Sequence, residues 1–100
     1  MHKLVVLYKT PKDPAHFKRY YETKHLPLAR KMPNVKSDRY SFAIQGMGGP
    51  APYFCIYEAD FDSEAAMGAA FASPEGKATV ADVANYATGE VIIMHFEVAK

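Results

Sequence analysis

Residues 3–14, KLVVLYKTPKDP, decide the fold because a strand pattern is followed directly by a helix start within this short segment. The run from Lys3 to Lys9 is aliphatic and β-branched, which is typical of a strand. The cluster that follows combines a turn with a helix start, in which Asp13 serves as the N-cap and Pro14 as the first helical residue. The sequence therefore predicts an N-terminal strand that passes directly into a helix.

This helix is predicted to be amphipathic and interrupted. Apolar residues recur at spacings of three and four over 17–32, and the positions between them are mostly Lys, Arg and Glu. Pro27 lacks an N–H and leaves the carbonyl of Thr23 without a helical partner. We expect a kink or restart at 25–26 and a stop at 32–34, where Met-Pro-Asn ends the pattern.

The rest of the chain alternates strand patterns with a helical crossover in two pieces. In chain order we expect a strand at 35–44, a Gly- and Pro-rich loop at 45–52, a strand at 53–61, a helix capped by Asp62 or Ser63, a second helix that starts at 73–75 and stops at Gly89, and a strand at 90–98.

The resulting order, βαββαβ, predicts an α+β fold. Helical crossovers between the first two strands and between the last two favour a ferredoxin-like sandwich, with a four-stranded antiparallel sheet and helices on one face. The length of 100 residues, 49% of them hydrophobic and 23% charged, suits one soluble globular domain over residues 1–100.

Charge and cysteine content restrict the partners and the compartment. The chain has twelve Lys and Arg residues and eleven Asp and Glu residues, and the two signs are interspersed along the sequence. A nucleic-acid partner is therefore disfavoured. Cys55 has no second cysteine to pair with, which points to a reducing compartment and hence to a cytoplasmic protein. The apolar run at 4–8 is too short for a signal peptide or a membrane span, so we expect no membrane partner.

Both faces of the sheet are predicted to be apolar. In the last strand Ile92, Met94 and Phe96 form one apolar side, while Val91 and Ile93 extend the other. The helices can cover only one face, so we expect the other to pack on the sheet of a second copy, giving a homodimer about a two-fold axis. The alternative is that short edge strands merely tolerate a few exposed aliphatic side chains.

His25 is the candidate catalytic residue. It falls at the edge of the apolar stripe, just before the Pro27 interruption, where a ring can reach both a pocket and solvent and can transfer protons near neutral pH. The alternative is a structural histidine that satisfies a carbonyl freed at the kink. The four histidines show no local metal-ligand spacing, so neither a metal nor a cofactor is expected.

Five further residues are candidate substrate-binding groups. Glu58 and His95 break two otherwise apolar strands, and they are either polar groups in a cleft or solvated groups near strand ends. Most of the seven tyrosines are expected to pack in the core or an interface, and a few to point a hydroxyl into a cleft. The tyrosines chosen for the cleft are Tyr8, Tyr21 and Tyr57.

Asp82 is not expected to belong to this site. It falls roughly opposite Val80 and Ala84 on its helix, and these apolar residues are expected to face the core. The pattern therefore predicts that Asp82 lies on the surface or faces a second subunit.

The chain as a whole resembles the EthD family, which belongs to the dimeric α/β-barrel superfamily. The segments that carry the resemblance are KLVVLYK at 3–9, residues 17–21, HLPLA at 25–29 with Met-Pro at 32–33, SPEG at 73–76 and DVAN at 82–85. The family usually has Gly after the Met-Pro turn, whereas this chain has Asn34, which also tolerates a left-handed conformation. His25 matches the family's histidine position.

The resemblance implies a ferredoxin-like subunit whose sheet meets a second sheet to enclose a barrel. It also implies a role in xenobiotic catabolism, since the family is named after ethyl tert-butyl ether degradation, which proceeds alongside a cytochrome P450 system. The activity expected is that of a cofactor-independent enzyme, oxidoreductase-like or isomerase/cyclase-like, in which His25 transfers a proton on a hydrophobic oxygenated or aromatic molecule. The alternatives are a non-catalytic binding or accessory protein for the oxygenase, and a purely structural dimer.

Overall fold

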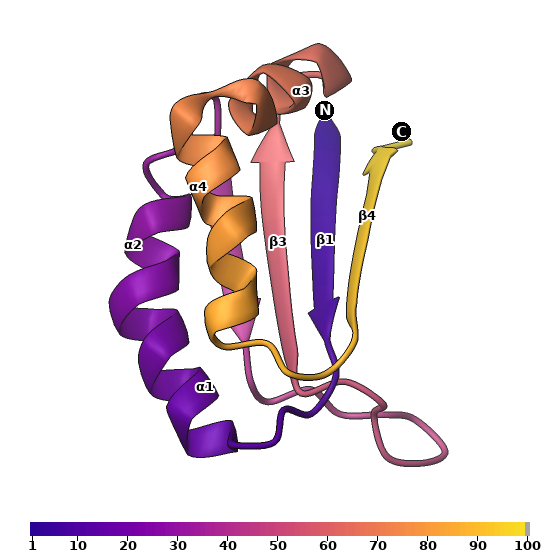
Figure 1. Ribbon diagram of the computed structural model, residues 1–100. Coiled ribbons are helices and arrows are strands. Elements are labelled where there is room, and N and C mark those ends of the chain that lie inside the picture. Colours follow the sequence, from indigo (N-terminus) through magenta and orange to yellow (C-terminus); the bar gives the residue numbers. More distant parts are fainter. Residues whose placement is uncertain (100) are drawn as a thin grey trace.

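The computed structural model describes residues 1–99 and contains four strands, with helices between the first and second and between the third and fourth (Figure 1). The elements in chain order are β1 (His2–Tyr8), α1 (Pro14–Tyr20), η1 (Tyr21–His25), α2 (Leu26–Ala29), β2 (Ser37–Ser41), β3 (Cys55–Phe61), α3 (Glu64–Ala72), α4 (Pro74–Asp82), η2 (Val83–Asn85) and β4 (Val91–Glu97).

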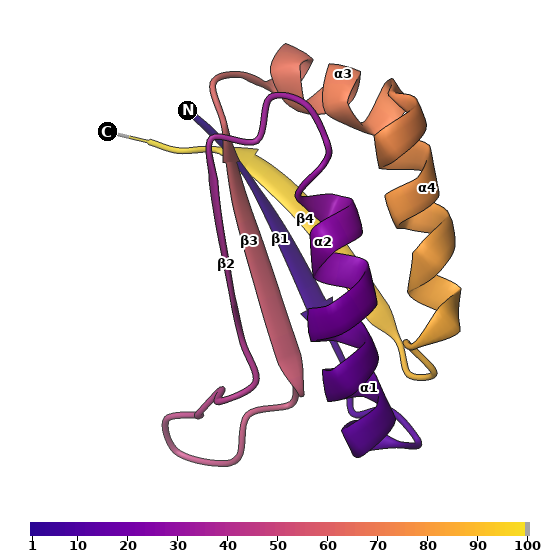
Figure 2. The same ribbon diagram turned by 90° about the vertical axis from the view of Figure 1, so that its left-hand side faces the viewer.

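The four strands form one antiparallel sheet in the order β2-β3-β1-β4. All helices lie on the same face of this sheet, so that the molecule has two layers (Figure 2). The predicted α+β architecture and the βαββαβ order are confirmed. No helix in residues 1–99 combines the length and the apolar character that crossing a bilayer requires.

The strand register assigns each side chain to one face. Val6 pairs with Tyr57 on β3 and with Ile93 on β4, and this row faces the helices. Val5 pairs with Met94, and this row lies on the outer face of the sheet. Because successive side chains in a strand point to opposite faces, this register fixes which predicted site residues can meet.

The predicted helix starts are confirmed. The side chains of Asp13, Ser63 and Ser73 cap α1, α3 and α4, and each accepts a hydrogen bond from the backbone N–H three residues further along. Each cap satisfies one of the N–H groups that have no partner within their own helix. Ser73 caps α4 directly where α3 ends, so the crossover is in two pieces, as predicted.

The interruption of the first helix is also confirmed. The N–H of Leu26 donates to the carbonyl of Tyr21, five residues back, and the intervening turn is a π-helical η1. Proline at position 27 then stands in the first turn of α2, where its missing N–H costs least. Asn34 has a φ of 69°, the left-handed conformation expected of the residue after the Met-Pro turn.

Several expected boundaries are wrong. The first crossover helix ends at Ala29 rather than at 32–34, and the second and third strands begin at Ser37 and Cys55 rather than at residues 35 and 53. The second strand ends at Ser41 rather than at residue 44, because its ladder with β3 ends at the pair of Ser41 and Ile56. Gly89 does not end the second crossover helix, since η2 already ends at Asn85. Gly89 is needed for another reason: a Cβ there would lie 3.0 Å from the carbonyl oxygen of Thr10, on the chain that leaves β1.

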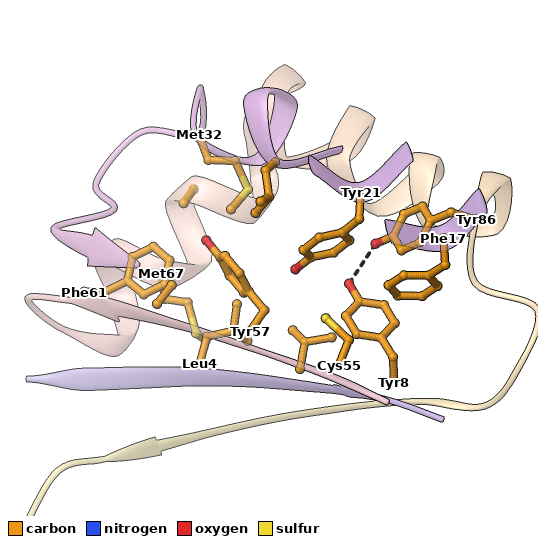
Figure 3. Packing of buried hydrophobic residues seen from close by; sticks show 14 residues of the cluster. Leu4, Tyr8, Phe17, Tyr21, Met32, Cys55, Tyr57, Phe61, Met67 and Tyr86 are labelled. Atoms are coloured by element: carbon orange, nitrogen blue, oxygen red, sulfur yellow. Dashed lines mark hydrogen bonds between the residues drawn. The ribbon is translucent and has the colours of Figure 1, made fainter. Parts of the chain in front are cut away.

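An aromatic cluster fills the space between the sheet and the helices (Figure 3). The ring of Phe17 is fully buried and packs edge-to-face on Tyr8 and Tyr86, with centroids 5.3 Å and 4.9 Å apart. The hydroxyl groups of Tyr8 and Tyr86 are hydrogen-bonded at 2.7 Å. This cluster forms one end of the cavity described next.

Candidate functional site

A cavity of about 50 Å³ lies between the sheet and the helix layer. Its walls are almost entirely apolar and come from β1, β3 and β4 below and from the helices above. Tyr8, Tyr21, His25 and Tyr57 all line it, so the structure brings four of the six predicted site residues together. In Figure 3, Tyr8 and Tyr57 rise from the sheet and Tyr21 descends from the helix layer.

The cavity opens between α4 and β4. Val80 on α4 and Ile93 on β4 both line it, yet they are 53% and 56% exposed. Figure 1 shows why: β4 is an edge strand that lies beyond the cover of α4. The enclosed space is smaller than the roughly 300 Å³ or more of most ligand pockets, so a ligand of more than a few atoms has to extend through this mouth.

His25 is the last residue of η1, and its side chain is only 5% exposed. Its Nδ1 lies 3.0 Å from Oδ2 of Asp82. Burial lowers the pKa of His25 from its ordinary value of 6.5, and the hydrogen bond and charge of Asp82 oppose this shift only in part. A neutral imidazole that donates from Nδ1 to a carboxylate carries its free lone pair on Nε2, which suits a general base.

The prediction that Asp82 faces away from the site is wrong. Its Oδ1 accepts hydrogen bonds from the hydroxyl of Tyr20 at 2.6 Å and from the amide of Asn85 at 2.8 Å, while Oδ2 faces His25. Burial opposes ionisation of this carboxyl, but the three hydrogen bonds outweigh burial and lower its pKa. Asp82 is therefore a carboxylate that orients the imidazole and stabilises its protonated form.

The inward face of α4 differs from the expected one. Val80 does not face the core but lies at the solvent-exposed mouth of the cavity. The inward positions are Gly76, Thr79 and the residues one turn further on. This inward face contains no continuous apolar stripe, so hydrophobic periodicity gave no signal for it.

Aromatic rings hold His25 in place. Its ring stacks on Tyr21, with centroids 5.4 Å apart and an interplanar angle of 26°, and it packs at 4.6 Å against Tyr86. Burial raises the pKa of Tyr8 to about 12 and raises those of Tyr21 and Tyr86 further. These phenols remain neutral near pH 7 and can act as hydrogen-bond donors.

Tyr57 connects the cavity to a second polar network. Its hydroxyl donates to Oδ2 of Asp38 at 3.0 Å, and Nε of Arg30 donates to the same oxygen at 3.1 Å. Burial is the main cause of the raised pKa of Tyr57. The Tyr57 ring is therefore fixed on the wall, with its hydroxyl engaged by Asp38.

The remaining two predicted binding residues lie elsewhere. Glu58 is on the outer face of the sheet, where its carboxylate accepts a hydrogen bond from Arg39 at 3.1 Å and lies 3.5 Å from Nζ of Lys3. His95 is exposed and hydrogen-bonded to His2. The alternation along the strands separates Glu58 from the cavity, and His95 lies beyond its end.

The cavity offers little to a charged cofactor. Its lining contains no Lys or Arg among residues 1–99 that could bind a phosphate group. The potential metal ligands that the structure brings together are instead His2, Glu64 and His95, at the opposite end of β1 from Tyr8. The spacing of these residues in the sequence gave no sign of their convergence.

Comparisons with known proteins agree with this architecture. An uncharacterized 11.0 kDa protein in the thcB-thcC intergenic region of Rhodococcus erythropolis is 38% identical over 94 residues, covering 94% of this chain and 91% of that protein. The crystal structure of an EthD family protein, bh0200 from Bacillus halodurans C-125, superposes with a TM-score of 0.90 at 29% identity and covers 99% of both chains.

A more distant structure is similar in fold alone. The dimeric ferredoxin-like protein of unknown function from Thermobifida fusca YX has a TM-score of 0.74 at 17% identity and covers 97% of this chain and 90% of that chain. The ferredoxin-like fold is therefore shared well beyond close relatives. The sequence profile of the EthD domain matches residues 9–90, from the end of β1 to the start of β4. The chain belongs to the EthD family.

Proposed function

We propose that this protein is a cofactor-independent enzyme that transfers a proton on a small hydrophobic molecule bound against His25. The observation that carries the proposal is the His25–Asp82 pair, which stands at the wall of an apolar cavity with a mouth to solvent. In the reaction, Nε2 of His25 accepts a proton from an acidic C–H or O–H of the substrate. Asp82 stabilises the imidazolium that forms, and His25 then returns the proton to the product.

The lining defines the class of substrate. Apolar walls and neutral phenols suit a neutral oxygenated or aromatic molecule, whose polar group can meet His25 and the hydroxyl of Tyr21 or Tyr8. Return of the proton to a different atom gives an isomerase-like or cyclase-like outcome. We assign substrate binding to Tyr8, Tyr21 and Tyr57, and not to Glu58 or His95, which do not line the cavity.

A homodimer through the outer face of the sheet is part of this proposal. Met94 and Phe96 are 48% and 47% exposed on that face, beside the half-buried Val5 and Ile92. A contiguous apolar surface of this kind favours a partner, and a second copy joined by a two-fold axis is the simplest one. The Thermobifida fusca protein with the same fold is dimeric, which supports a dimer here.

The pathway proposed is the breakdown of xenobiotic ethers or related compounds, for which the family is named. We place the protein in the cytoplasm, because its one cysteine, Cys55, is buried and free. A second candidate function is a non-catalytic binding protein that serves a cytochrome P450 system. The apolar lining favours this candidate too, because it can hold a neutral hydrophobic molecule without any chemical step.

One experiment separates the two functions. The purified protein is incubated in deuterated buffer with a panel of small aryl ketones and phenols, and NMR follows deuterium incorporation into each compound while thermal denaturation reports binding. An enzyme exchanges substrate protons, and His25→Ala lowers the rate by about 10²- to 10⁴-fold. A binding protein shows a rise in Tm with these compounds but no exchange above that of the variant.

A further inference from the structure

We propose that His2, Glu64 and His95 form a zinc-binding site that joins the N-terminal strand, the C-terminal strand and the start of α3. The ligand atoms that these three side chains offer all lie within 4.8 Å of one another. They come from three elements at one end of the molecule, where β1 begins, β4 ends and α3 begins (Figure 1). None of the three lines the His25 cavity.

The two histidines already face each other as a pair of ligands would. Nε2 of His2 lies 2.8 Å from Nδ1 of His95, and the two ring centroids are 5.1 Å apart at an interplanar angle of 48°. In a tetrahedral zinc site with Zn–N bonds of about 2.0–2.1 Å, two ligating nitrogens stand roughly 3.3 Å apart. Zinc binding therefore requires the two nitrogens to move apart by about half an ångström and the exposed His95 ring to turn, so that both lone pairs point at the metal. The proton of the hydrogen bond moves to the other nitrogen of its own ring, so both imidazoles bind as neutral ligands.

The backbone fixes the positions of these rings. His2 stands opposite Glu97 on β4, and His95 stands opposite Leu4 on β1, so the two rings are diagonal neighbours on the helix-facing side of the sheet. The side chain of His2 is buried, at 6% exposure, and its ring has little freedom to turn away. A rigid strand pair is a better support for metal ligands than a loop.

The third ligand is a carboxylate that is free to adjust. Glu64 is exposed and opens α3, and the neighbouring Ser63 hydroxyl is engaged in capping that helix. Together with His2, Glu64 lines a polar hollow of about 260 Å³ to which Asp62 and Glu97 also contribute. The hollow thus places negative charge beside the His2 imidazole and leaves room for a water molecule as the fourth ligand.

The chemistry of the three ligand atoms indicates which metal they bind. Two imidazole nitrogens and one carboxylate oxygen suit Zn²⁺ and its first-row neighbours, whereas Ca²⁺ and Mg²⁺ require oxygen ligands. An occupied site would tie α3 to the end of the ladder where β1 begins and β4 ends. We therefore expect zinc to stabilise the folded protein independently of any chemistry at His25.

The test uses the full chain without a polyhistidine tag, because a tag would compete for the metal. After treatment with EDTA and removal of the chelator, the protein is titrated with ZnCl₂ by calorimetry and with CoCl₂ by visible absorption. We expect one Zn²⁺ per chain, a rise in Tm and the absorption bands of tetrahedral Co²⁺. Loss of one ligand in His95→Gln or Glu64→Gln should weaken zinc binding by at least about tenfold.

Two matched controls locate the binding. His16→Gln removes a histidine outside the cluster, and His25→Gln removes the one in the cavity, so both should keep the zinc affinity of the parent protein. Because His2 is buried, the exposed His95 provides the decisive variant, and the Tm of its metal-free form shows that it is folded. Equal zinc affinity in the parent protein and in His95→Gln, or loss of binding in either control, would overturn the proposal.

Discussion

His25 and Asp82 are separated by 57 positions in the sequence, yet Nδ1 of the imidazole lies 3.0 Å from Oδ2 of the carboxylate. The contact joins the π turn of the first crossover to the end of α4 in the second. It fixes the ring at the cavity wall, and it gives the molecule a pair of groups whose protonation is coupled.

Replacing the carboxylate should lower both the activity and the pKa of the histidine. In Asp82→Asn the imidazole loses the charge that partly offsets its burial, so the pKa of His25 should fall further below 6.5. We expect the proton-exchange rate to fall at least about tenfold, as the imidazolium loses its stabilising partner. An NMR titration of the His25 ring measures the pKa. Tyr20→Phe keeps the carboxylate and is the control with the smaller effect.

Acid should destabilise the protein through His25. The pKa of His25 is lower in the folded protein than the ordinary 6.5 that applies to the unfolded chain, so the unfolded state binds the proton more readily. The stability is therefore fully present above about pH 6.5 and falls below it, by at most about 1.4 kcal/mol per pH unit. Urea denaturation between pH 8 and pH 5 should show a shallower decline for His25→Gln. Parallel curves for the two proteins would contradict this assignment.

Two helical glycines should respond in opposite ways to alanine. A Cβ at Gly76 would meet the carbonyl oxygen of Ala70 and come within 2.7 Å of the Cα of Phe71, where α4 crosses the end of α3. Gly76→Ala should therefore cost about 1–3 kcal/mol. Gly68 has nothing within 4 Å of the same position, so Gly68→Ala should stabilise α3 by about 0.5–1 kcal/mol. Chemical denaturation of the two variants checks both signs.

The buried hydroxyl pair of Tyr8 and Tyr86 should show strong coupling. Either single change to Phe leaves one hydroxyl without its 2.7 Å partner, which should cost about 1–3 kcal/mol. The double change removes both groups and should cost less than the sum of the single changes. A double-mutant cycle of unfolding free energies measures the coupling. Strict additivity would show that each hydroxyl has another partner.

The outer face of the sheet should control the state of assembly. Replacing Phe96, which is 47% exposed there, by Asp should shift a dimer towards monomers because it places a charge in the apolar contact. Val80→Asp is the matched control, because Val80 is 53% exposed but lies on the helix side. Sedimentation at several concentrations distinguishes the two. A parent protein that remains monomeric at high concentration would remove the basis for the proposed dimer.

Features that depend on neighbouring residues could be predicted from the sequence. Asp13 and Ser73 cap helices because their side chains reach a backbone N–H three positions away. The restart at residues 25–26 follows from the missing N–H of Pro27. The alternation of apolar residues in β1 and β4 is a local property too, so the number, type and order of the elements followed from it.

Contacts between distant segments were decided by the tertiary structure alone. Asp82 reaches His25, and His2 reaches His95, only after the helices cross the sheet and the strands adopt one particular register. The hydrophobic pattern records which side chains avoid water but not which polar groups meet, because a polar residue turned inward breaks the periodicity that reveals a buried face. The sequence by itself thus determined the sheet, the helices and the candidacy of His25, whereas its carboxylate partner depended on how the two crossovers pack together.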